Sequence, residues 1–283
     1  MEDDKRYINC KKLLIEVNQK CNLNCTYCFY RDYGRNNQEL SIRKLKETLN
    51  DLPNVKEFYL TGGECFLAKD IGKMIKYLSE LGEVITFSNG TVLNTLSKQD
   101  LIEIVNLVSR FIITYDSNDF ENFKCRRKLD ETFSLLKKMV SINSNKLEVK
   151  VCITKYNYSY IDEIFKYLID NGVKNLSTNL VFDIKNSEIK HEVDDIQDLR
   201  MVFSVIDKYK DYFNKNYIEV LKEFYLNNII TEKYPCIADR EYLFMDCLGD
   251  LLICPGNKKQ IGDRGDWKKC FSKECINEWE MFY

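Results

Sequence analysis

"VNQKCNLNCTYCFYRD" (residues 17–32) carries three cysteines, Cys21, Cys25 and Cys28, with three and then two residues between them. The segment directly follows KLLIEV (12–17), a β-branched, apolar run that is typical of a buried strand. A structural zinc site closes with four ligands, and no fourth thiol or histidine lies nearby. Three thiolates can instead hold three irons of a 4Fe–4S cluster and leave the fourth iron open. A zinc or thiol-redox site is the alternative interpretation.

Strand-like and helix-like segments alternate along the next 200 residues or so. Strands are predicted at 12–17, 57–63, 83–90, 111–117, 146–155 and 173–183. Helices are predicted at 41–52, 71–82, 97–110, 120–142, 160–172 and 195–213, with Ser41 and Ser97 as N-caps. Six such units are too few for the closed eight-unit barrel. The predicted fold class is therefore α/β: a partial (β/α)6, TIM-like barrel with a small cysteine-rich C-terminal domain.

Polar or glycine-containing segments follow the first four predicted strands. The cysteine segment follows the first, TGGE (61–64) the second, SNG (88–90) the third, and TYDS (114–117) lies at the end of the fourth. Because the carboxyl ends of parallel strands meet at one rim, these segments should form one site.

The pattern changes near residue 234. We expect a barrel core at 1–215, a linking helix at 216–234 and an auxiliary domain at 235–283. The last range has short strands, glycines and five cysteines: Cys236, Cys247, Cys254, Cys270 and Cys275.

Composition excludes several classes of protein. The 283 residues carry a net charge of −2, so no basic excess indicates a nucleic-acid or membrane partner. No apolar run approaches the length of a membrane span and no signal peptide is evident, so we expect a cytoplasmic protein. Twelve cysteines in such a chain favour metal binding or thiol chemistry over disulfides.

These motifs together resemble the radical S-adenosylmethionine (radical SAM) superfamily, over at least residues 12–180. The resemblance implies a 4Fe–4S cluster on Cys21, Cys25 and Cys28, with bound S-adenosylmethionine. It also implies that Tyr27 lies near adenine and that Gly62, Gly63 and Glu64 meet the methionine amino group. Ribose and the methionine carboxylate would be contacted by Ser88, Asn89, Thr114 and Asp116.

The family's chemistry follows from that arrangement. The amino and carboxylate groups of the cofactor chelate the open iron, and one electron cleaves the sulfur–C5′ bond to give a 5′-deoxyadenosyl radical. This radical removes a hydrogen atom from the substrate. An electron donor such as flavodoxin or ferredoxin is implied.

The C-terminal cysteines resemble the family's auxiliary-cluster extension, called SPASM or, in its shorter form, twitch. Cys236, Gly249 and Cys254 fit its opening. A probable second 4Fe–4S cluster would be held by Cys236, Cys254, Cys270 and Cys275. The alternative is a tail stapled by zinc.

Two further thiols are tentative hydrogen-atom donors. Cys65 follows GGE where relatives usually have proline, and Cys247 is an extra thiol in the tail. For Cys65 the alternative is local packing. Cys10, Cys125 and Cys152 are expected to be small buried or half-buried residues, and a catalytic role for His191 is a minor hypothesis.

The substrate is less well determined. The resemblance is closest to enzymes that modify ribosomally made peptides by epimerisation or crosslinking. The absence of room for a leader-recognition domain before Cys21 weakens this expectation. The alternatives are a radical SAM oxidoreductase of a small metabolite and, from another class, a zinc-binding scaffold. A glycyl-radical activase is a minor fourth alternative.

Overall fold

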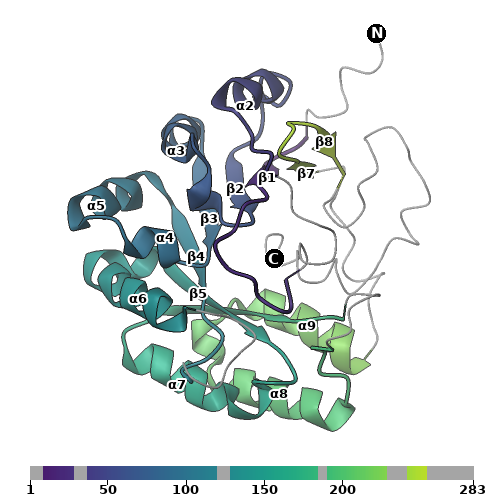
Figure 1. Cartoon of the computed structure of the whole chain (residues 1–283). Helices are drawn as coiled ribbons and strands as arrows, with labels where there is room; N and C mark the ends of the chain where they lie inside the picture. Colours follow the sequence, from purple (N-terminus) through teal and green to yellow (C-terminus); the bar gives the residue numbers. More distant parts are fainter. Residues whose placement is uncertain (1–8, 29–36, 120–127, 184–189, 228–240, 254–283) are drawn as a thin grey trace.

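One mostly parallel sheet organises the chain (Figure 1). The computed structural model describes residues 9–28, 37–119, 128–183, 190–227 and 241–253. In order along the sheet, the strands are β6 (Asn175–Leu180), β5 (Leu147–Ile153), β4 (Arg110–Thr114), β3 (Glu83–Ser88), β2 (Glu57–Gly62), β1 (Lys12–Asn18), β7 (Tyr242–Met245) and β8 (Leu251–Leu252). Neighbouring strands from β6 to β7 are parallel, and β8 is antiparallel to β7. The predicted α/β fold with a partial, TIM-like barrel is confirmed.

Helices cover the outside of the curved sheet (Figure 1). They are α2 (Ile42–Leu49), α3 (Ile71–Ser79), α4 (Thr91–Asn94), α5 (Lys98–Leu107), α6 (Leu129–Asn143), α7 (Ile161–Asp170), α8 (Ile196–Lys208) and α9 (Lys215–Asn227), with short 3-10 turns η2 (Cys65–Leu67), η3 (Ser144–Lys146), η4 (Tyr158–Tyr160) and η5 (Lys210–Tyr212). The predicted caps form: Ser41 Oγ accepts from Lys44 N, and Ser97 Oγ from Asp100 N. Within the described ranges, no helix has both the length and the apolar character needed to cross a bilayer.

Side chains alternate between the two faces of the sheet. Leu13, Ile15 and Val17 of β1 belong to the large core under the helices, whereas Leu14 belongs to a second apolar cluster on the inner face. The inner-face cluster also contains Tyr59, Ile85, Ile112, Tyr242, Phe244 and Leu252. Toward the carboxyl ends of the strands the inner face becomes half-exposed, at Thr61, Phe87, Thr114, Cys152 and Asn179. The open part of the inner face therefore lies beside the predicted site.

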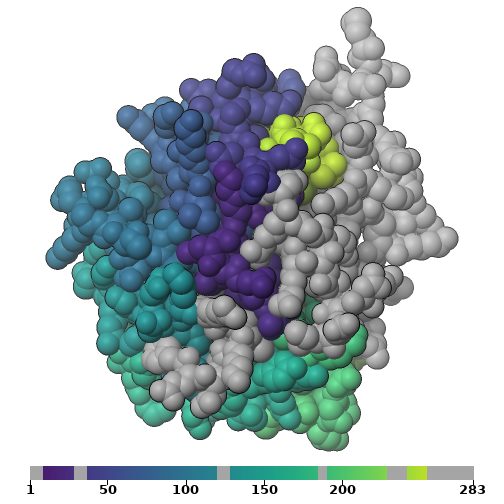
Figure 2. Space-filling model, in the orientation of Figure 1, coloured from purple at the N-terminus to yellow at the C-terminus, as the bar shows by residue number. Residues whose placement is uncertain are grey.

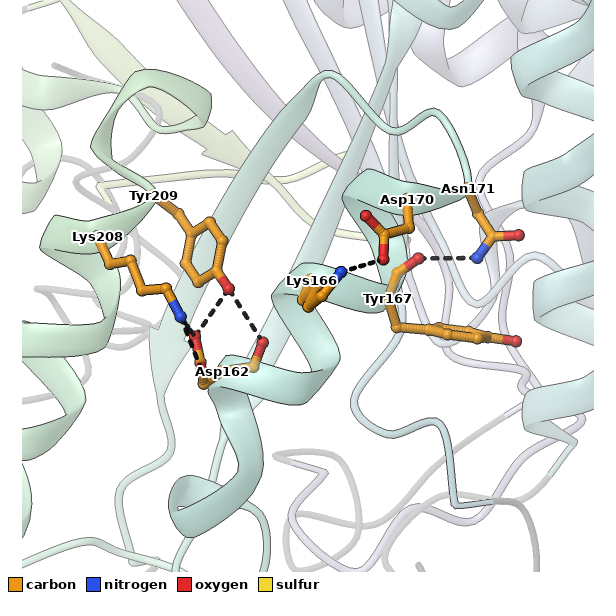
Figure 3. Close-up of polar contacts among 7 residues, drawn as sticks. All are labelled: Asp162, Lys166, Tyr167, Asp170, Asn171, Lys208 and Tyr209. Carbon is orange, nitrogen blue, oxygen red and sulfur yellow. Dashed lines mark hydrogen bonds and ion pairs between the residues drawn. The ribbon is translucent and has the colours of Figure 1, made fainter.

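Charged hydrogen bonds connect two neighbouring helices of the outer layer, α7 and α8 (Figure 3). At the start of α7, Asp162 accepts hydrogen bonds from Lys208 Nζ at 2.7 and 2.9 Å and from the Tyr209 hydroxyl at 2.7 Å. These bonds hold the pKa of Asp162 below its usual value. They join α7 to the end of α8.

Strand β7 bears on the predicted domain division. It lies inside the range 235–283, yet it pairs with β1 from Lys12–Tyr242 to Ile15–Met245, and all its residues are buried. The sheet of the barrel thus continues across the predicted boundary at 235. Residues 228–240 and 254–283 lie outside the described part of the chain, so a separate auxiliary domain stays a prediction.

Candidate active site

The three-cysteine loop leaves the carboxyl end of β1. Cys21, Cys25 and Cys28 are half-buried, and the Cys28 amide donates to the Cys25 carbonyl at 3.2 Å. In Figure 2 this dark purple segment is visible at the surface, in the middle of the face shown. The loop therefore presents three thiols at the rim of the sheet.

The GG turn after β2 packs directly against the start of this loop. Gly63 N donates to Asn18 O at 3.0 Å, and Glu64 N donates to Lys20 O at 2.6 Å. A Cβ on Gly62, where φ is +147°, would lie 2.2 Å from Asn18 O, and one on Gly63 would lie 2.2 Å from Lys20 O. Only glycine allows the two backbones to approach this closely.

The Glu64 carboxylate joins the ends of β2 and β3. Oε2 accepts from Asn89 N at 2.7 Å, and Oε1 accepts from Ser88 Oγ at 2.8 Å and Phe66 N at 3.2 Å. The residue is buried. These bonds are internal to the protein, so contact between the carboxylate and a methionine amino group stays a prediction.

The SNG segment reaches the cysteine loop through Asn89. Its Nδ2 lies 3.7 Å from Cys21 Sγ and 3.0 Å from Asn22 Oδ1. The end of β3 is thereby connected to the first thiol of the loop.

The end of β4 reaches the same loop through Asp116. The Tyr27 hydroxyl donates to Asp116 Oδ2, and Asp116 Oδ1 accepts from Cys152 N at 2.9 Å. Asn157 Nδ2 donates to the Asp116 carbonyl at 2.9 Å. The four strand-end segments predicted to share one rim are therefore brought together around the three cysteines.

Comparison with known proteins agrees with this geometry. The profile of the radical SAM superfamily matches residues 15–199, more than half of the chain. The chain belongs to the radical SAM superfamily. The matched range contains every rim segment described above.

Similar proteins include a nucleotide cyclase and a protein solved with a bound peptide. An uncharacterized protein of Methanocaldococcus jannaschii is 25% identical, over 87% of this chain and 85% of its own length. The GTP 3′,8-cyclase of Clostridium perfringens is 23% identical, over 93% of this chain and 75% of its own length. Streptococcus suis SuiB bound to precursor peptide SuiA superimposes with a TM-score of 0.69 at 20% identity, over 94% of this chain and 65% of the SuiB chain. This chain thus spans slightly less than two thirds of SuiB, and the likeness to SuiB shows the shared fold.

Membership of the radical SAM superfamily implies a 4Fe–4S cluster and S-adenosylmethionine, and the loop fits such a cluster. Cys21 Sγ accepts N–H groups from Leu23 at 3.4 Å and from Asn89 at 3.7 Å, as suits a thiolate sulfur. Among the described residues, no three histidine, cysteine or acidic side chains converge on a single-ion site. In a four-iron cluster each thiolate binds a different iron, so three neighbouring but separate thiols are suitable ligands.

The predicted cofactor-binding residues fall into two groups. Half-buried residues that a ligand can touch are Tyr27, Gly62, Gly63 and Thr114. Buried residues that hold the rim together are Glu64, Ser88, Asn89 and Asp116. The hydrogen bonds of the second group are made within the protein, and contact of these four residues with a cofactor stays a prediction.

The structure places Cys65 away from the rim surface. Its thiol is fully buried and donates to the Phe87 carbonyl at 3.1 Å, and burial raises its pKa well above the usual value. This burial favours the packing alternative for Cys65, and a part as a hydrogen-atom donor stays a prediction.

Cys247 lies beside the site, just after β7. Its backbone N–H donates to Glu16 Oε2 at 3.3 Å, and Glu16 stands on the inner face of β1. Burial, with Glu16 as the next cause, raises the pKa of the Cys247 thiol to about 12. The predicted auxiliary ligands Cys236, Cys254, Cys270 and Cys275 lie outside the described residues, as does Cys125.

Two residues that were not among the predicted site residues lie close to them or on the inner face of the sheet. His191 is buried, with its ring edge-to-face with Tyr27 at 6.0 Å and with Tyr156 at 5.4 Å. Cys152 is half-buried on the inner face of β5, paired in register with Asn179. The only available signal for His191 was its being the sole histidine, and for Cys152 it was the alternation along its strand.

Proposed function

We propose that Cys21, Cys25 and Cys28 hold the 4Fe–4S cluster of a radical SAM enzyme that modifies a ribosomally made peptide. One observation carries the site assignment: the GGE and SNG segments are both hydrogen-bonded to the loop that bears these three thiols. When bound, the cluster and S-adenosylmethionine supply a 5′-deoxyadenosyl radical that removes a substrate hydrogen.

The residues of the rim have distinct parts in this proposal. Tyr27 and Thr114, both half-buried, would contact the adenosine portion of the cofactor, and the half-buried backbone of Gly62 and Gly63 would bind the methionine amino group. Glu64 joins the GG turn to the SNG segment through its carboxylate bonds, and its backbone N–H donates to Lys20 O at the start of the cysteine loop. The inner face of the barrel orients the substrate and keeps water away from the radical.

A peptide substrate is supported by the complex of SuiB with precursor peptide SuiA, which shares this fold. The reaction is epimerisation or crosslinking. In epimerisation, the Cys247 thiol would give a hydrogen atom to the face of the peptide Cα opposite to the one that had lost its hydrogen. The resulting thiyl radical returns to a thiol with one electron from a donor such as flavodoxin or ferredoxin and one proton from water.

Cys247 is a better donor than Cys65 on structural grounds. Cys247 adjoins Glu16, an inner-face residue only a few positions before Cys21, whereas Cys65 points into the core toward the Phe87 carbonyl. We expect Cys247→Ala to form 5′-deoxyadenosine with the peptide but to give no epimer. Cys152→Ala is the matched control, since it removes another inner-face thiol. Unchanged epimer formation by Cys247→Ala would exclude this role.

A small metabolite is the second candidate substrate. The similarity to GTP 3′,8-cyclase over most of the chain favours it, and an oxidoreductase or cyclase of a nucleotide-sized molecule uses the same radical. Reconstituted enzyme with reductant would be incubated with GTP or with a short peptide encoded beside its gene. Substrate-dependent 5′-deoxyadenosine, with a change in the mass or chirality of the peptide, supports the first candidate. The same signal with GTP alone supports the second.

The second cluster is proposed for Cys236, Cys254, Cys270 and Cys275. Iron and sulfide would be counted in anaerobically reconstituted wild type and in a variant with Cys21, Cys25 and Cys28 changed to alanine. Two clusters give about eight irons in wild type and about four in the variant. A variant with no iron would overturn the second cluster, and zinc without iron in wild type would indicate a zinc-binding scaffold.

A further inference from the structure

The side-chain amide of Asn89 contacts a thiol that is proposed as a cluster ligand. Its Nδ2 lies 3.7 Å from Cys21 Sγ and also donates to Asn22 Oδ1 at 3.0 Å. Asn89 is 9% exposed, so water competes little for this amide.

The orientation of the amide follows from its other end. Asn89 Oδ1 accepts from Thr91 N at 2.9 Å and from Thr91 Oγ1 at 2.7 Å. A backbone N–H can only donate, so the oxygen must face Thr91 and the NH2 group must face Cys21. Asn22 Nδ2 donates to Thr91 Oγ1 at 2.7 Å and closes the ring of bonds.

The backbone of Asn89 is anchored independently of the cysteine loop. Its N–H donates to Glu64 Oε2 at 2.7 Å, and its carbonyl accepts from Thr132 Oγ1, on α6, at 2.8 Å. The backbone of Asn89 is therefore held in place by Glu64, which follows β2, and by α6, without any cofactor. The Asn89 side chain is thus already oriented toward Cys21, whereas a side chain that only contacted the ribose of the cofactor would not need this orientation.

A fixed N–H dipole beside a cluster sulfur affects electron transfer. Reduction adds negative charge to the cluster and its thiolates, so a donor that points at a sulfur stabilises the reduced form more than the oxidised form. Hydrogen bonds to the sulfurs are among the features that set cluster potentials. The Leu23 amide, 3.4 Å from Cys21 Sγ, is a second donor to the same atom.

We propose that Asn89 is a positioning residue that raises the reduction potential of the cluster through its hydrogen bond to Cys21. This inference rests on the proposed cluster assignment to Cys21, Cys25 and Cys28. It gives Asn89 a part in electron entry, in addition to any contact with the cofactor.

The test is an EPR-monitored redox titration of the reconstituted protein. We expect Asn89→Ala to shift the midpoint potential to a more negative value. Asn89→Asp should shift it further, because it removes the donor and adds a negative charge. The matched control is Asn22→Ala, which removes the other partner of the amide but leaves the bond to sulfur, so its potential should stay at the wild-type value. Equal shifts in Asn89→Ala and Asn22→Ala would overturn the inference.

A second measurement uses only the wild-type protein, so it does not depend on how well a variant incorporates the cluster. Wild type labelled with 15N in asparagine side chains should show a hyperfine coupling to the reduced cluster in pulsed EPR. Absence of the coupling would overturn the inference. Iron content distinguishes a failure of the cluster assignment from a failure of the proposed role of Asn89. If the triple cysteine variant keeps all its iron, the cluster assignment to Cys21, Cys25 and Cys28 is wrong. If Asn89→Ala carries the full iron content and its midpoint potential equals that of wild type, only the proposed role of Asn89 is wrong.

Discussion

The hydroxyl of Tyr27 donates a hydrogen bond to the carboxylate of Asp116. Tyr27 belongs to the three-cysteine loop and Asp116 follows β4, so the bond fastens the loop to a strand on the other side of the site. The second Asp116 oxygen accepts from Cys152 N at 2.9 Å, which ties the same carboxylate to β5.

Tyr27→Phe removes the hydrogen bond to Asp116 but keeps the aromatic ring. A hydrogen bond to a charged group contributes about 1.5–3 kcal/mol when buried, and Tyr27 is only half-buried. We therefore expect the Kd for S-adenosylmethionine to rise roughly fivefold, or about 1 kcal/mol, in calorimetric titration. Tyr160→Phe is the control, since its hydroxyl contacts the Tyr156 carbonyl at an exposed position. Equal affinities in both variants would contradict the fastening role.

Gly63→Ala should displace the cysteine loop. The added Cβ would lie 2.2 Å from Lys20 O and 2.6 Å from Lys20 C, both backbone atoms that cannot move aside alone. We expect loss of most of the cluster iron and a fall of more than about 2 kcal/mol in unfolding free energy.

Gly72→Ala is the matched control for Gly63→Ala. Nothing lies within 4 Å of the corresponding Cβ on α3, so alanine should stabilise the helix by about 0.5–1 kcal/mol. Urea unfolding and iron analysis of both variants test the pair. Full iron content in Gly63→Ala would show that the loop tolerates the shift.

Glu64→Gln should weaken the junction of β2 and β3. An amide has one acceptor oxygen, so one of the donors Ser88 Oγ, Asn89 N and Phe66 N loses its partner in a buried position. An unsatisfied buried donor costs about 1–3 kcal/mol, and we expect about 2 kcal/mol from urea unfolding of the cluster-free protein. Ser88→Ala, which removes one neutral donor, should cost about 1 kcal/mol. A smaller loss in Glu64→Gln than in Ser88→Ala would be inconsistent with a central role for the carboxylate.

Stability should decline in alkali because of Cys10. Burial raises the pKa of its thiol from 9.0 to about 12. The unfolded chain loses this proton first as pH rises, so the stabilising contribution is complete below pH 9 and is lost between about pH 9 and 12. At pH 10.5 the loss is about 2 kcal/mol. Urea midpoints at several pH values should show a shallower decline in Cys10→Ala than in wild type. Parallel declines would assign the effect to other groups.

Much of the fold follows from local patterns. The β-branched, apolar runs in segments such as KLLIEV and the serine caps at Ser41 and Ser97 are properties of neighbouring residues, so the six strands and their helices could be predicted. The common rim could also be predicted, because parallel strands deliver their carboxyl ends to one edge. The spacing of Cys21, Cys25 and Cys28 indicated the cluster chemistry without any coordinates.

Other features depend on contacts between distant parts of the chain. Strand β7 pairs with β1, far away in sequence, and a four-residue apolar run does not reveal its partner. The burial of Cys65 could not be read from its neighbours in sequence, which lie on the rim while its own thiol contacts the Phe87 carbonyl. His191, which follows β6 in the sequence, lies edge-to-face with Tyr27 of the cysteine loop, and such a contact between residues far apart in the chain is not visible in a local pattern.

The sequence by itself thus determined the fold class and the three-thiol loop, because periodicity, capping and ligand spacing are encoded within a few consecutive residues. The tertiary structure alone decided which polar side chains support the loop and which thiols face the inner side of the barrel. Glu64, Asn89 and Asp116 support the site through hydrogen bonds that link the ends of different strands and the cysteine loop. Such bonds depend on the direction and burial of each side chain, which long-range packing sets.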